Sequence, residues 1–176
     1  METSGDCVRQ GRTFAALFAG MSLAMASHAL AVDCVQYVKS SSNFGLSGNA
    51  WSWWGHAAGV YDRSNEPRAG AVLVFERTRR MPAGHVALVS RVVDDYTVLI
   101  DHANWSATGG GDGRVRRGVA AIDCSPHHDW SSVCVWNSEF HSFGHPYSTA
   151  GFIYPQEPSP AQIGSIKPPA RATAAR

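Results

Sequence analysis

The sequence predicts an α+β arrangement, in which two short N-terminal helices precede a set of antiparallel strands. Residues 33–38 and 51–58 carry apolar side chains at helical spacing. Residues 71–75 and 85–105 contain short runs rich in Val, Leu and Ile, bounded by Pro, Gly and Asp, as is typical of strands. The chain has 176 residues and a formal net charge of +1, which fits one domain with a modest core.

Residues 1–31 are expected to be a secretory signal peptide. Arg9 and Arg12 precede an apolar run, and Ala29-Leu30-Ala31 is a small-x-small cleavage site, with Ala24-Met25-Ala26 as an alternative. The run is short for a membrane span of roughly 20 residues, so we expect no stable span after signal cleavage. The mature protein is therefore expected in the periplasm or outside the cell.

The cysteine count singles out one thiol in the exported chain. Cys7 leaves with the signal, so Cys34, Cys124 and Cys134 remain, an odd number for an oxidising compartment. Cys124 and Cys134 are the close pair and flank a short loop, which predicts a disulfide between them. Cys34 is then the cysteine left free for chemistry.

Cys34 is expected at the first position of a short helix. Asp33 is a suitable N-cap and Gln36 follows three residues later, which approximates a capping box. The partial positive charge of a helix N-terminus favours a thiolate there. Residues 40–43 are Ser, Ser, Ser and Asn, so the helix is expected to end after about two turns.

The later elements follow in order along the chain. Trp51, Trp54 and Ala58 lie at i, i+3 and i+7, which predicts a second helical segment that stops near Gly59. Residues 106–118 are rich in glycine and predict a surface loop. Strands are expected at residues 71–75, 85–93, 96–105, 119–123, 133–136 and 151–154. The domain is therefore expected to span 32–154, followed by a disordered Pro/Ala-rich tail at 155–176.

The predicted hairpin at 85–105 places three polar residues on one sheet face. If Asp94-Asp95 forms a two-residue turn, His85 faces Asn104, with His102 on the same face. Asp101 points to the other face. This count makes Asn104 the nearest neighbour of His85, and a loop one residue longer or shorter would reverse the parity.

Other chemistries have weak support in the sequence. The near-neutral charge gives no indication of nucleic-acid binding. Four histidines in the C-terminal half are candidate metal ligands, but no His-Glu-x-x-His motif is present, so exposed side chains are the better interpretation of His127, His128, His141 and His145. Neither a serine-nucleophile motif nor a well-placed carboxylate pair is evident. We therefore expect no metal and no cofactor.

Several motifs, in this order, resemble the CHAP domain of cysteine- and histidine-dependent amidohydrolases/peptidases, within the NlpC/P60 papain-like superfamily. They are Cys34-Val35-Gln36-Tyr37-Val38, Gly48-Asn49-Ala50-Trp51, Pro67-Arg68-Ala69-Gly70 with the strand at 71–75, Gly84-His85-Val86-Ala87-Leu88-Val89 and Asn104-Trp105. The resemblance implies a papain-like α+β fold and cleavage of amide bonds in peptidoglycan. It implies that Cys34 is the nucleophile and His85 the general base.

The third catalytic residue stays open between two candidates. CHAP domains often carry Glu-x-Asn-Trp where this chain has His102-Ala103-Asn104-Trp105. Asn104 would orient His85 as in papain-like sites, whereas His102 would do so as in NlpC/P60 members with a second histidine. The sequence thus predicts an exported, monomeric cysteine amidase or endopeptidase that acts on peptidoglycan. The alternatives are a catalytically inactive CHAP-fold wall-binding or scaffold protein, or an amidase for a small exported substrate.

Overall fold

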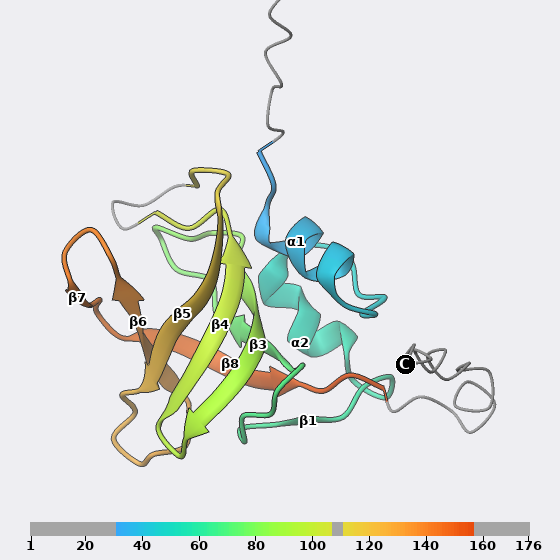
Figure 1. Ribbon diagram of the computed structural model, residues 1–176. Helices are drawn as coiled ribbons and strands as arrows, with labels where there is room; N and C mark the ends of the chain where they lie inside the picture. The colour runs from blue at the N-terminus through green and yellow to red at the C-terminus, as the bar shows by residue number, and fades with distance from the viewer. Residues whose placement is uncertain (1–30, 107–110, 157–176) are drawn as a thin grey trace, which may run out of the picture.

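The computed structural model describes residues 31–106 and 111–156 (Figure 1). The predicted signal peptide and C-terminal tail lie outside the described residues, apart from Ala31 and residues 155–156. Within the described part of the chain, no helix is long and apolar enough to cross a membrane.

Three short helical segments precede the strands. They are α1 (Cys34–Ser41), the 3-10 turn η1 (Ala50–Ser52) and α2 (Trp53–His56). The strands are β1 (Arg63–Ser64), β2 (Val72–Phe75), β3 (His85–Asp94), β4 (Thr97–Ala103), β5 (Val115–Asp123), β6 (Ser132–Asn137), β7 (Ser142–Phe143) and β8 (Tyr147–Ile153). All strand pairs are antiparallel, in the order β1-β8-β2-β3-β4-β5-β6-β7.

The sheet closes on itself, and this overturns the predicted fold class. β8 pairs with β2 on one side and with β6 on the other, so β8 and β2–β6 form a closed barrel of six strands. The described chain is mostly antiparallel β with only two short α-helices. The prediction of a papain-like α+β fold, with short N-terminal helices packed on an antiparallel sheet, is therefore wrong. The sequence predicts a last strand at 151–154, whereas β8 begins at Tyr147, and its extra residues pair with β6.

Two apolar clusters hold the fold together. One draws residues from all six barrel strands and fills the interior; its members include Leu73, Phe75, Ala87, Val98, Ile100, Ala121, Val133 and Phe152. The other lies between the barrel and the helices, where Val38 and Trp53 pack against Val72, Val74 and Val86. β2 is buried along its whole length because alternate side chains face the two clusters. Figure 1 shows α1 and α2 on one flank of the barrel, away from β6 and β7.

A disulfide joins the end of β5 to β6, which confirms the predicted pair Cys124–Cys134. Their Cα atoms lie 6.0 Å apart, and ten positions separate the two cysteines in the sequence. In the chain-entropy picture a loop this short contributes about 2–3 kcal/mol to stability. Cys34 is the free cysteine of the described chain.

Candidate active site

Cys34 is the first residue of α1, as predicted. The carboxylate of Asp33 accepts a hydrogen bond from the backbone N–H of Gln36 at 2.7 Å, which satisfies one of the free donors of the helix N-terminus. Tyr37 and Val38 are the buried residues of this helix and pack it against the barrel. The cap and the apolar face together fix the position of the Cys34 side chain.

The environment of the Cys34 thiol raises its pKa. Burial is the largest cause, because it disfavours the charged thiolate. A backbone hydrogen bond from Val86 acts in the opposite direction, and the negative charge of Asp33 adds to the increase. The backbone N–H groups at the helix start lower the pKa of Cys34, as expected of a helix N-terminus, but burial outweighs this effect. The contact with Val86 also places the sulfur beside the residue that follows His85.

Cys34 and His85 line the same pocket, which has a volume of about 750 Å³. It lies between the start of α1, the loop 76–84 that precedes β3, and the start of β8. Asn104 and Trp105 line it from the end of β4. The structure thus brings together the predicted nucleophile, the predicted base and one of the two candidate orienting residues.

His102, which is the other candidate, contacts His85 directly. The Nε2 atom of His85 lies 3.2 Å from Nδ1 of His102, and both side chains are buried, with 3% and 1% of their surfaces exposed. Trp105 packs edge-on against both rings, at centroid distances of 4.5 Å from His85 and 5.6 Å from His102. The aromatic wall excludes water from one side of the pair and limits ring rotation.

Asn104 is turned toward β5. Its backbone adopts a left-handed conformation with φ of 62°, and its N–H donates to the carbonyl of Arg114 at 2.9 Å. Its side-chain Oδ1 accepts a hydrogen bond from the N–H of Gly113 at 2.8 Å. The β3–β4 ladder ends at Leu88 and Asp101, before the predicted pairing of His85 with Asn104 is reached. Of the two residues left open by the sequence, His102 therefore holds the hydrogen bond to His85.

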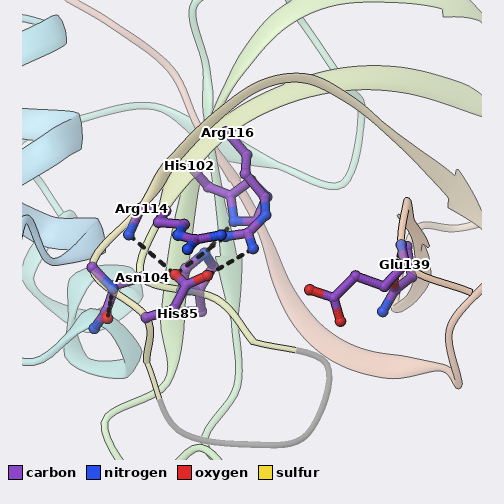
Figure 2. Close-up of polar contacts among 9 residues, drawn as sticks. His85, His102, Asn104, Arg114, Arg116 and Glu139 are labelled. Carbon is purple, nitrogen blue, oxygen red and sulfur yellow. Dashed lines mark hydrogen bonds and ion pairs between the residues drawn. The ribbon is translucent and has the colours of Figure 1, made fainter.

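An ion pair that the sequence does not reveal lies next to His102. Arg116 pairs in register with His102 across β4 and β5, and its guanidinium holds the carboxylate of Asp112 through contacts of 2.7 and 3.2 Å (Figure 2). The basic run 114–117 falls in the predicted surface loop, but its residues from Val115 onward form the start of β5. The signal in the sequence that could have indicated the start of this strand is the apolar–polar alternation of Val115 and Arg116 after the glycine-rich stretch.

Both histidines are held in their neutral forms. Burial and then the charge of His102 lower the pKa of His85 well below its ordinary value of 6.5. Burial, followed by the positive charge of Arg116, lowers the pKa of His102 to about 4. At neutral pH the site therefore contains a thiol and two uncharged imidazoles, rather than a thiolate–imidazolium pair.

The low pKa of His102 predicts a loss of stability in acid. Because the unfolded chain protonates near 6.5 and the folded one near 4, the stabilisation is complete above pH 6.5 and is lost as the pH falls toward 4. At about 1.4 kcal/mol per pKa unit, this one group accounts for about 3 kcal/mol. Denaturant unfolding between pH 7 and 4 measures it, with His102→Gln as the comparison. Equal pH slopes for wild type and variant would contradict the expectation.

The four histidines considered as metal ligands are not part of the His85–His102 pair, although His145 lines the same pocket as Cys34 and His85. His127, His128, His141 and His145 are exposed, as predicted. Among residues 31–106 and 111–156, no group of three or more His, Cys, Asp or Glu side chains is arranged to hold a metal ion.

A comparison with protein families finds the CHAP domain over residues 25–104, a little under half of the chain. The predicted resemblance to the CHAP domain is confirmed over this segment. The matched region includes Cys34, His85, His102 and Asn104, whereas Asp112, Arg116 and Tyr147 lie beyond it. No curated protein matches the chain.

Proposed function

We propose that this chain, whose residues 25–104 match the CHAP domain, is an exported cysteine hydrolase that cleaves an amide bond of peptidoglycan. CHAP domains are amidohydrolases/peptidases associated with peptidoglycan. The observation that carries the proposal is the shared pocket, which the free cysteine Cys34 and the base candidate His85 both line, with His102 hydrogen-bonded to His85.

The reaction starts from the neutral pair. His85 takes the proton of Cys34 as the sulfur attacks the carbonyl carbon, so that a C–S bond forms and the carbonyl oxygen gains the negative charge. His85 then gives this proton to the leaving nitrogen, the C–N bond breaks, and a thioester and an amine result. A water molecule, deprotonated by His85, attacks the thioester, which releases the carboxylic acid and restores the thiol.

His102 has the role of holding His85 in the productive tautomer. If His85 keeps its proton on Nε2 and donates it to Nδ1 of His102, its own Nδ1 is free to serve as the base. His102 then carries its proton on Nε2, a buried atom without a hydrogen-bond partner among the described residues. An imidazolium formed at His85 during the attack is stabilised by the acceptor on His102.

The negatively charged oxygen of the tetrahedral intermediate is proposed to bind at the start of α1. The first backbone N–H groups of a helix have no partner within the helix, and Asp33 occupies only that of Gln36. The N–H groups of Cys34 and Val35 lie next to the attacking sulfur and act on it. They are donors of the kind that stabilise a tetrahedral intermediate.

Export is part of the proposal. CHAP domains are typical of extracellular cell-wall enzymes, and the Cys124–Cys134 disulfide is consistent with an oxidising compartment. Residues 1–31 remain the proposed signal, and a monomeric state stays a prediction.

Product analysis on purified sacculi tests the proposed function. We expect the wild-type protein to release fragments with one new amine and one new carboxylate per cleavage, detected by mass spectrometry, without new reducing sugar ends. Prior alkylation of Cys34 by iodoacetamide at alkaline pH, where the thiolate forms, is expected to stop release. Unchanged release after complete alkylation, or new reducing ends in place of amines, would sink the proposal.

A further inference from the structure

The charged side chains of the catalytic pocket are unevenly placed. Among the described residues that line it, Asp33, Arg79 and Arg80 are the ones with a formal charge. The carboxylate of Asp33 lies at the Cys34 end, where it caps α1 and raises the pKa of the thiol. Neither arginine is in an ion pair with an acidic side chain of the described chain. The pocket therefore has two uncompensated positive charges on the wall formed by the loop 76–84.

A tight turn presents these two arginines. The N–H of Met81 donates to the carbonyl of Thr78 at 3.1 Å, and the N–H of Thr78 donates back to the carbonyl of Met81 at 3.0 Å. Arg79 and Arg80 are the two central residues of this turn, so their side chains project from its tip. The hydroxyl of Thr78 also accepts from the N–H of Met81 at 3.1 Å.

The loop that carries the turn is anchored at both ends. The N–H of Glu76 donates to the carbonyl of Ser148 in β8 at 2.9 Å, and the carbonyl of Ala83 accepts from the N–H of Trp51 in η1 at 3.1 Å. The backbone of the turn is thus held on two sides of the pocket. When a ligand binds, only the side chains of the two arginines then lose conformational entropy, because the backbone of the turn is already fixed.

A row of rings connects the arginines to the catalytic base. Burial raises the pKa of the Tyr147 phenol, and the positive charge of Arg80 partly offsets this rise, so Arg80 acts on Tyr147. The ring of Tyr147 lies 4.9 Å from that of Trp105, which lies 4.5 Å from His85. Since an extended peptide advances about 3.5 Å per residue, the ring of Tyr147, which the charge of Arg80 reaches, lies within roughly three residues of a bond cleaved beside His85.

We propose that Arg79 and Arg80 form a subsite for a free carboxylate of the substrate, so that the pocket selects acidic peptides. This inference rests on the proposed function and names its substrate class. A guanidinium holds a carboxylate through paired, charge-assisted hydrogen bonds. Asp33 repels a carboxylate from the start of α1, next to Cys34, so an acidic peptide is expected to lie across Cys34 with its carboxylate toward the arginines.

Sacculi with modified carboxylates test the subsite. Native sacculi are compared with sacculi whose carboxylates have been converted to carboxamides with a carbodiimide and ammonia. In a Cys34→Ala background, which separates binding from cleavage, we expect co-sedimentation with native sacculi to be about tenfold tighter than with amidated sacculi. The double variant Arg79→Gln/Arg80→Gln is expected to bind native sacculi as weakly as amidated ones.

The matched control is Arg77→Gln/Arg91→Gln. It also removes two positive charges, but from exposed positions that do not line the pocket. It is expected to keep the tenfold preference. Equal binding to the two forms by the Cys34→Ala protein, or an undiminished preference in the Arg79→Gln/Arg80→Gln variant, overturns the subsite.

Cleavage by the protein with Cys34 intact separates this inference from the proposed function. If it binds native sacculi with the expected preference but cleaves neither form, the proposed hydrolase function fails and the carboxylate subsite stands. If the Arg79→Gln/Arg80→Gln enzyme cleaves native sacculi with an unchanged KM, the subsite is refuted while the hydrolase function stands.

Discussion

Replacing Cys34 with alanine is expected to reduce the release of fragments from sacculi by about 10⁴-fold or more. The variant removes the atom that forms the thioester, and the remaining groups of the pocket supply only binding and oxyanion stabilisation. The fold is expected to survive, because Asp33 caps α1 through Gln36 and the buried contacts of the helix come from Tyr37 and Val38. Initial rates of fragment release by the wild type and the variant measure the effect. Equal melting temperatures of the two proteins show that the variant is folded.

Two further variants make this experiment decisive. Cys34→Ser puts a hydroxyl in the place of the thiol. This variant is expected to lose nearly as much activity as Cys34→Ala, because a hydroxyl is far harder to deprotonate than a thiol. The double variant Cys124→Ser/Cys134→Ser removes the two disulfide-bonded cysteines at the far end of β5, so it is expected to lower stability and keep activity. Fragment release by Cys34→Ala at more than about a tenth of the wild-type rate would refute the assignment of Cys34.

The same comparison separates the enzyme from a wall-binding protein with the CHAP fold. A protein without activity would bind sacculi equally well with Cys34 intact or replaced by alanine, and would release nothing in either form. The speed of thiol alkylation at pH 7 does not separate the two, because burial raises the pKa of Cys34 even in an active site of this kind. Cleavage by a neutral thiol depends on His85 as the base, so activity and alkylation speed need not agree. The assay that separates the two proteins must therefore measure the products of cleavage.

The local features of the site were predictable, because short-range rules determine them. Asp33 and Gln36 gave the helix start at Cys34, and the close spacing of Cys124 and Cys134 gave the disulfide. Closure of the barrel was not predictable in this way. It depends on the pairing of β8 with β6, and the strand pattern of residues 147–150 is interrupted by Ser148 and Thr149, whose contacts form only in the barrel.

The hairpin register shows how a correct result follows from an incorrect turn. The sequence predicts the turn at Asp94-Asp95, but Asp94 faces Thr97, which moves each partner by two positions. Two irregularities, one between Val92 and Asp94 and one between Val89 and Arg91, each move it back by one. The ladder therefore reaches the predicted pair of Leu88 and Asp101. Beyond this pair the strands separate, which is why Asn104 leaves His85 and bonds to Gly113.

This separation leads to the second large effect, which concerns His102. Replacing His102 with leucine is expected to lower kcat by about 10²- to 10⁴-fold, because Nε2 of His85 loses its hydrogen-bond acceptor and the tautomer with a free Nδ1 is no longer favoured. Asn104→Ala is expected to cost less than about tenfold, since its side chain bonds to Gly113 rather than to His85. Steady-state kinetics on a soluble peptidoglycan fragment that still contains the cleaved bond measure both variants.

A conservative variant tests whether His102 acts through this hydrogen bond or only through packing. His102→Gln places an amide oxygen near the position of Nδ1, so it is expected to recover part of the kcat lost in His102→Leu, with little change in KM. A purely structural role would instead make both variants lose activity in proportion to their melting temperatures. An Asn104→Ala enzyme with a greater loss of kcat than His102→Leu would show that the papain-like assignment is correct. It would also mean that Asn104 leaves Gly113 to reach His85 once substrate is bound.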